Sequence, residues 1–242
     1  MSTEQHRIVV GGLAIQIVRK RIKNLHLGVY PPHGRVRVAV PMTVSDEAVR
    51  LAVVGKLGWI RRQRAGFEAQ ARQSRREMAD GESHYLFGRR YRLRVVDGRQ
   101  AGHIVVRSSS VIEMQGRGGM DEAARERVLQ RWYRQQLKAV VPSVLQKWQP
   151  VLGVQAGAWA IRKMKTKWGS CTPQSRRIWL NLELAKKPVR CLEYIVVHEL
   201  VHLLERRHNG RFMSLMDEHL PDWRILRAEL NAAPLAHEKW TY

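Results

Sequence analysis

The stretch "VVHELVHLLERRH", residues 196–208, concentrates side chains that can bind a metal ion or move a proton. His198 and His202 are four residues apart, so on a helix both imidazoles project from one face and can bind the same tetrahedral zinc ion. Glu199 is rotated by about 100° from His198, which places its carboxylate beside the metal as a general base. The pattern predicts a zinc-dependent hydrolase; the alternative is a helix whose histidines only pack in the core or lie on the surface.

A third ligand is needed to complete a catalytic zinc site with one open water position, and His208 is the first candidate. A helix that continued past His202 would carry His208 away from the metal-binding face. His208 therefore reaches the metal only if the chain turns near residues 206–210, where Asn209 and Gly210 offer a turn. The side chains that could replace it as a ligand are Glu205, Glu218 and His219.

The elements around this motif predict a C-terminal domain over residues 119–242. The stretch "PVRCLEYIVVHELVHLLERRH" has Pro188 near a helix start and apolar residues at helical spacing. A shorter helix follows and stops near Pro221. Upstream lie a long amphipathic helix that Pro142 should kink or divide, a strand in "AWAIRKMK", and two extended segments around a turn at 172–176. We expect the HExxH helix to pack on this small sheet.

Residues 1–118 form a predicted N-terminal region that is mostly β with one helix. Residues 7–40 alternate apolar and polar side chains, a helix follows with Thr43 or Ser45 as its N-cap, and the period of two returns over residues 79–114. Asp97–Gly98 is a hairpin signal. The glycine-rich link at 115–119 leads into the C-terminal part, with which this region could also form one continuous domain. The fold class is α+β, and no internal repeat is evident.

The composition favours a soluble, basic protein. The 242 residues carry a formal charge of +22, spread along the whole chain, which indicates either polyanionic partners such as nucleic acid or the base composition of the host genome. Only Cys171 and Cys191 occur, so no disulfide framework is expected. Because no signal peptide or membrane-length apolar stretch is present, we expect a cytoplasmic protein with no membrane partner. Its oligomeric state is left open.

The C-terminal half resembles the YgjP-like metallopeptidase family. The resemblance is carried by "KTKWGSC", "IWLNLELAKKP" and "YIVVHELVHLLERRHNGRFMSLMDEHLPDW", about residues 165–223, with weaker similarity in "LHLGVYPPHGRVRVAVP", "KLGWI" and "LFGRRYRL". It implies a gluzincin-like minimal zincin fold related to the SprT and WLM groups. It also implies one zinc per chain on His198, His202 and His208, with Glu199 as base. Two departures, Glu193 for the common Asp and "RRHNGRF" for "NHSxxFW", remove no ligand.

Several residues outside the motif are candidates for substrate binding or support. Trp168, Gly169 and Ser170 could form an edge strand that binds an extended peptide through main-chain hydrogen bonds, or a packing turn under the helix. Asn181 could hydrogen-bond the loop that carries Trp168 or bind substrate, and we expect the structural role. Lys165 and Lys167 could attract an anionic substrate, and Cys171 is expected to be a small buried residue. The unranked candidates for stabilising an oxyanion are Tyr194, Arg162 and Arg211.

Three functions are compatible with these patterns. The first is a zinc-dependent metallopeptidase whose substrate is a peptide or protein. The second is a metal-dependent hydrolase of nucleotides or other phosphorylated small molecules, which the missing phosphate-binding glycine loop disfavours. The third is a non-enzymatic nucleic-acid-binding protein with a structural metal, which would need a cysteine ligand. We expect the first.

Overall fold

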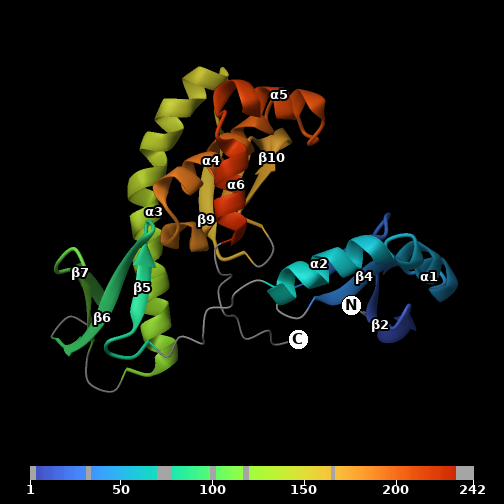
Figure 1. The fold of residues 1–242 in the computed structure, drawn as a ribbon, viewed down its shortest axis with the longest axis horizontal. Helices are drawn as coiled ribbons and strands as arrows, with labels where there is room; N and C mark the ends of the chain where they lie inside the picture. The colour runs from blue at the N-terminus through green and yellow to red at the C-terminus, as the bar shows by residue number, and fades with distance from the viewer. Residues whose placement is uncertain are drawn as a thin grey trace. The chain divides into compact units, whose positions relative to one another are not determined.

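The computed structural model describes residues 4–30, 34–69, 78–98, 102–116, 120–164 and 167–232 (Figure 1). The chain divides into two compact units, unit 1 over Met1–Ala71 and unit 2 over Arg72–Tyr242. The sequence placed the division at 118–119 instead. Among the described residues, no helix is both long enough and apolar enough to cross a bilayer. The sheets and helices confirm the α+β class.

Unit 1 consists of a four-stranded sheet and two helices. The strand order is β1-β2-β4-β3, in which β2 and β4 are parallel and the outer pairs are antiparallel. The elements are β1 (Gln5–Val10), β2 (Leu13–Lys20), β3 (His26–Tyr30), β4 (Arg35–Pro41), α1 (Asp46–Val54) and α2 (Leu57–Ala69).

The core of unit 1 follows from the alternation in its strands. Val36, Val38 and Val40 share one buried face of the sheet, where they belong to the same core as Val49 of α1 and Ile60 of α2. The N-cap is Ser45, whose hydroxyl accepts a hydrogen bond from the backbone N–H of Ala48 at 3.2 Å. The predicted single helix is divided, because α1 ends before Gly55 and α2 begins at Leu57.

Unit 2 begins with a second four-stranded sheet, in the order β5-β6-β8-β7 with β6 and β8 parallel. Its strands are β5 (Ser83–Leu86), β6 (Arg89–Asp97), β7 (His103–Val106) and β8 (Val111–Gly116). The prediction of a hairpin at Asp97–Gly98 is wrong, because β6 ends at Asp97 and the next strand, β7, pairs with β8 rather than with β6. Strand β6 takes β5 and β8 as its partners instead.

The two four-stranded sheets repeat one topology. In each sheet the first two strands form a hairpin, and the third and fourth strands form an antiparallel pair. The fourth strand then lies parallel to the second, β4 to β2 and β8 to β6. Both first hairpins turn through two residues at positive φ: Gly11 and Gly12 at 55° and 78°, Phe87 and Gly88 at 47° and 82°. That is the twist a two-residue hairpin requires. The structure thus repeats one sheet topology, which the sequence did not reveal: the two turns have only one glycine position in common, and the strands have only their alternation in common.

Helix α3 (Glu122–Leu152) joins the second sheet to the C-terminal elements. Its buried face contributes Leu129, Trp132 and Tyr133 to a core that also contains Leu93 of β6 and Leu192 further along the chain. This shared core explains why unit 2 extends upstream of the glycine-rich link at 115–119. Pro142 lies inside α3 and does not divide it.

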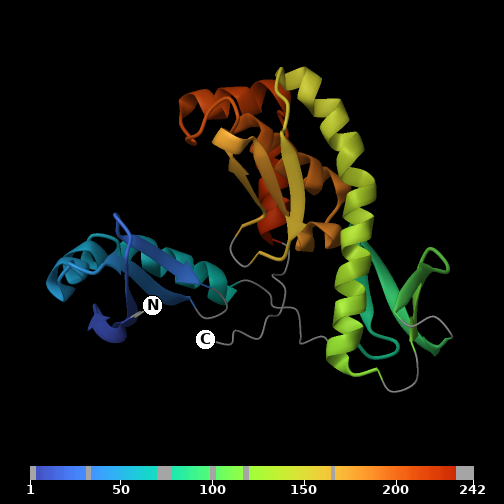
Figure 2. The ribbon, with the colours of Figure 1, turned by 180° about the vertical axis from the view of Figure 1, so that it is seen from behind.

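The C-terminal part of unit 2 is a three-stranded sheet with helices on one face. Strand β11 lies between β10, its antiparallel partner, and β9, its parallel partner. In Figure 1 helix α4 lies in front of these strands, and in Figure 2, seen from behind, the strands lie in front. The elements are β9 (Ala158–Arg162), β10 (Gly169–Thr172), β11 (Arg177–Asn181), short 3-10 helices at Pro173–Ser175 and Leu182–Lys186, α4 (Val189–Val201), α5 (Gly210–His219) and α6 (Trp223–Ala232).

Candidate metal centre

Helix α4 places His198 and Glu199 because it is buried on almost every side. Its apolar residues, among them Leu192, Val196 and Leu200, are fully buried, and the helix contacts β10, β11, α3 and α6. The helix ends at Val201, and His202 is its C-cap, with its backbone N–H donating to the carbonyl of His198 at 3.3 Å. His202 therefore lies directly after the helix, whereas the sequence predicted one helix through the whole motif.

A turn after His202 brings His208 back to His198. The Nε2 atoms of these two histidines are 3.0 Å apart, and the ring of His202 lies 4.8 Å from that of His198 and 4.7 Å from that of His208. One nitrogen of each of the three imidazoles lies within 4.8 Å of the others. The chain bends over residues 206–209, within the predicted range, and the backbone N–H of Asn209 donates to the carbonyl of Arg207 at 2.8 Å. Asn209 also caps α5, its side chain accepting from the backbone N–H of Phe212 at 3.0 Å.

The ring of Phe212 packs against all three histidine rings. It is buried, and its centroid lies 4.9 Å from those of His198 and His202 and 4.7 Å from that of His208. Because Asn209 caps the helix that carries Phe212, the start of α5 fixes both the third imidazole and the apolar surface under all three.

The electrostatics of the cluster keep its imidazoles neutral. Burial lowers the pKa of His198 to about 3, and repulsion between a proton on His198 and one on His202 or His208, or the charge of Arg227, acts in the same direction. Burial also lowers the pKa values of His202 and His208. Neutral imidazoles are the form that binds metal. In addition, Nδ1 of His198 is buried with no hydrogen-bond partner among the described residues. Three converging neutral imidazoles fit a transition-metal ion such as zinc.

Glu199 is a buried carboxylate pressed against strand β10. It is 4 % exposed, and burial raises its pKa to about 8, partly offset by the positive charge of Lys167. A Cβ atom added to Gly169 would lie 2.4 Å from Oε1 of Glu199, so only glycine leaves room for the carboxylate here. Its other oxygen, Oε2, is buried without a hydrogen-bond partner in the described structure. An unpartnered carboxylate of raised pKa is suited to accept a proton near neutral pH.

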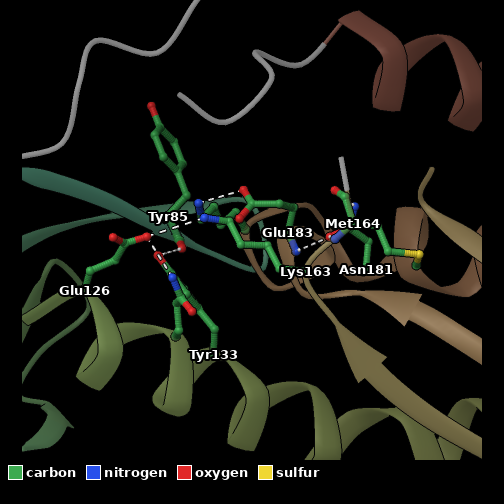
Figure 3. Close-up of polar contacts among 9 residues, drawn as sticks. Tyr85, Glu126, Tyr133, Lys163, Met164, Asn181 and Glu183 are labelled. Carbon is green, nitrogen blue, oxygen red and sulfur yellow. Dashed lines mark hydrogen bonds and ion pairs between the residues drawn. The ribbon is translucent and has the colours of Figure 1, made fainter. Parts of the chain in front are cut away.

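Asn181 anchors the loop that leads into β10, as the sequence predicted. Its side-chain amide donates to the carbonyls of Met164 at 2.8 Å and Lys167 at 2.7 Å, and its backbone N–H donates to the carbonyl of Trp168 at 2.9 Å. Its side-chain oxygen accepts from the backbone N–H groups of Met164 and Glu183, both at 3.2 Å. Figure 3 shows Asn181 beside Met164. Asn181 therefore holds the strand that carries Gly169.

The sheet that contains β5 and β6 contacts α3 and the segment that leads into α4. The hydroxyl of Tyr133 on α3 donates to the carbonyl of Tyr85 on β5 at 2.8 Å (Figure 3). At the next turn, the backbone N–H of Phe87 donates to the carbonyl of Ala185 at 2.8 Å, and Gly88 packs against Pro188 at the start of α4. The repeated sheet thus buttresses the helix that carries His198 and Glu199.

The residues predicted to bind substrate lie on and before the edge strand β10. Gly169 faces Glu199, and Ser170 pairs with Trp179 on the opposite side of the strand. Trp168 is half-buried, with the Lys187 ammonium 5.6 Å from its ring centroid. Because β10 pairs with β11 alone among the described strands, its other edge has main-chain groups free for a ligand.

The structure places the remaining candidate residues at different distances from the histidine cluster. Tyr194 is buried with its ring 5.9 Å from that of His198, whereas the guanidinium of Arg162 lies over Trp179. Glu205, Glu218 and His219 do not belong to the histidine cluster. Cys171 is half-buried, and burial raises the pKa of its thiol to about 11, so it stays protonated. Lys165 lies outside the described residues, and Arg211 is exposed on α5.

Arg227 on α6, an exposed residue, affects the electrostatics of the cluster, which the sequence did not indicate. Its positive charge is among the causes that lower the pKa values of His198 and His208, and it acts in the same direction on Tyr194, whose pKa burial raises overall. No motif links position 227 to residues 198–208; only the packing of α6 on α4 brings them together.

Three imidazoles beside a buried carboxylate define a candidate metal centre of the kind that metallohydrolases use. The family model of the YgjP-like metallopeptidase domain matches residues 23–233, so the chain belongs to the YgjP-like metallopeptidase family. Among solved structures, the metallopeptidase zymogen abylysin of Pyrococcus abyssi is 21% identical, with a TM-score of 0.35, over 38% of this chain and 91% of that one. Comparison with curated proteins gave no match.

Proposed function

We propose that the protein is a zinc-dependent metallopeptidase, with zinc on His198, His202 and His208 and Glu199 as general base. The observation that carries this proposal is the convergence of the three imidazoles, one of them on the residue before the buried Glu199. Zinc held by these residues would supply a Lewis acid for the scissile carbonyl and lower the pKa of a bound water.

The chain's own residues then account for proton transfer. The unpartnered Oε2 of Glu199 can accept the proton of the attacking water, because its raised pKa makes the carboxyl a competent base near neutral pH. The same oxygen can deliver that proton to the leaving amine. Gly169 keeps the carboxylate close to the strand on which a substrate would lie.

An extended peptide is the substrate class that the strand geometry favours. The free edge of β10 offers alternating N–H and C=O groups, and a peptide that pairs with it passes Gly169 and hence Glu199. Neither cysteine belongs to the cluster of ligand atoms found in the described residues, which disfavours a purely structural zinc site.

The test is turnover of a fluorogenic peptide library by wild type and Glu199→Gln, with zinc content measured on the same samples. Loss of the base should lower kcat by about 10²–10⁴-fold while zinc stays bound. Glu218→Gln, an exposed change outside the cluster, is the matched control and should keep wild-type turnover. Full activity of Glu199→Gln would refute the mechanism, and hydrolysis of nucleotides instead of peptides would refute the substrate class.

A further inference from the structure

The three-stranded sheet has a second face, opposite to the face that contacts α4. Ile178 and Leu180 are buried in the core, so Trp179 between them projects to the other side. The strand register places Ala160 and Ser170 directly beside Trp179. We call this surface the outer face. By register and alternation its members are Ala158, Ala160, Arg162, Ser170, Thr172, Arg177, Trp179 and Asn181, of which Asn181 is buried under the loop that it binds.

Two guanidinium groups lie over the indole ring at the centre of the outer face. The Cζ atom of Arg162 is 4.8 Å and that of Arg177 is 5.8 Å from the Trp179 ring centroid. Both arginines are exposed and Trp179 is half-buried, while the neighbouring strands contribute only the small side chains of Ala160 and Ser170. The result is an aromatic centre with two guanidinium groups over its ring.

The charge of the outer face is not neutralised by the protein. The face contains no acidic side chain, and within the described residues no ion pair joins Arg162 or Arg177 to a carboxylate. Other cations of unit 2 differ in this respect: Arg190 lies 2.8 Å from Glu229, and Lys147 lies 2.6 Å from Glu193. Arg162 and Arg177 therefore keep their charge and their N–H donors for an external anion.

We propose that the outer face binds single-stranded nucleic acid, with bases stacked on the cluster of Trp179 and its two overlying guanidinium planes, and with phosphates bound by the N–H groups of Arg162 and Arg177. Single strands expose both the faces of their bases and their phosphates, and proteins bind them through aromatic platforms bordered by cations. Duplex bases are stacked, and the major groove admits a helix or a two-stranded ribbon rather than the face of a sheet. The net charge of +22 adds a long-range attraction for the same ligand.

This face is separate from the metal centre. Gly169 turns toward Glu199 on the α4 side of the sheet, whereas Trp179 lies on the other side. A bound strand could thus be held beside the centre without entering it. The binding assay requires no turnover, so its outcome is independent of the proposed peptidase activity.

The test is fluorescence anisotropy with a labelled oligothymidylate of about 12 nucleotides, a length within the range that single small domains cover. The variant Arg162→Gln/Arg177→Gln should bind at least about tenfold more weakly and reduce the salt slope of log K by about 1.4, or 0.7 per phosphate contact. The control Arg90→Gln/Arg92→Gln removes the same charge from exposed positions of β6 and should change binding by less than about threefold.

The aromatic requirement is tested separately at position 179. Trp179→Phe should retain binding and Trp179→Leu should weaken it about tenfold, because stacking tolerates any aromatic ring. Circular dichroism and zinc content report whether each variant is folded, and the arginine variants, changed only at exposed positions, carry the test if Trp179→Leu does not fold. If Arg90→Gln/Arg92→Gln lost as much affinity as Arg162→Gln/Arg177→Gln, the site would be refuted. It would also be refuted if the protein bound a duplex of the same length more tightly and Trp179→Leu did not change that affinity.

Discussion

Replacement of Gly169 by alanine tests whether the strand controls the position of the base. The new Cβ atom would lie 2.4 Å from Oε1, 2.8 Å from Cγ and 2.9 Å from Cδ of Glu199, whereas ordinary contact begins at 3.4 Å. Glu199 must therefore move by about 1 Å, and a displacement of that size costs about 10²-fold in rate. We expect Gly169→Ala to lower kcat about a hundredfold on the peptide substrate and to destabilise the fold by about 1–3 kcal/mol through overpacking.

The control for this variant is Gly210→Ala, also close to the cluster. A Cβ atom at Gly210 meets nothing within 4 Å and the residue has no positive φ, so this variant should keep its activity within about twofold. Both variants should retain zinc, because neither replaces a histidine. The double variant Gly169→Ala/Glu199→Asp should lose less than the product of the two single losses, since the shorter side chain relieves the clash. Wild-type kcat in Gly169→Ala, or loss of its zinc, would refute the reasoning.

Three further changes are predicted from the same contacts. In metal-free protein, Glu199 keeps its proton up to a pKa of about 8, whereas its ordinary value is 4.5, so folding stability should fall as pH rises between these values, by about 1.36 kcal/mol per pH unit relative to Glu199→Gln. Parallel urea-unfolding curves from pH 5 to 8 would contradict this. Asn181→Leu should cost on the order of 3 kcal/mol in urea unfolding, since the carbonyls of Met164 and Lys167 lose their donors; a loss below about 0.5 kcal/mol would show that the loop does not depend on Asn181. Asn209→Ala should cost about 1 kcal/mol through the lost helix cap and weaken zinc affinity, whereas Asn209→Ser should restore both in a competition titration with a chelator. Unchanged zinc affinity in Asn209→Ala would show that the helix cap does not influence metal binding.

Much of the local structure could be predicted from the sequence because it depends on periodicity. The alternation in β4 and the apolar stripe of α4 set which side chains are buried, and the spacing of His198 and His202 places them one turn apart. The loop contacts of Asn181 were also predicted correctly. The helix and strand features depend on residues close together in the chain, where elementary geometry is sufficient, whereas the Asn181 contacts span 14 and 17 positions.

The rest depends on tertiary packing that no local pattern contains. His208 returns to His198 only because the chain turns immediately after α4 and Asn209 caps α5. Arg227 lowers the pKa values of His198 and His208 because α6, which carries it, packs on α4. The predicted boundary at 118–119 followed a glycine-rich link, but α3 shares its core with strands upstream of that link, so the compact unit begins near residue 72. The repeated sheet was hidden because strand pairing, rather than residue identity, is what repeats.

The most direct test of the central claim is the zinc content of the purified chain, measured by mass spectrometry on wild type, His202→Ala, His208→Ala and His219→Ala. The cluster predicts one zinc per wild-type chain, its loss in His202→Ala, and weakened binding in His208→Ala. His219→Ala, outside the cluster at the end of α5, should bind zinc as wild type does. Wild-type protein that takes up no zinc when zinc is offered would contradict the assignment of the three histidines as a metal centre.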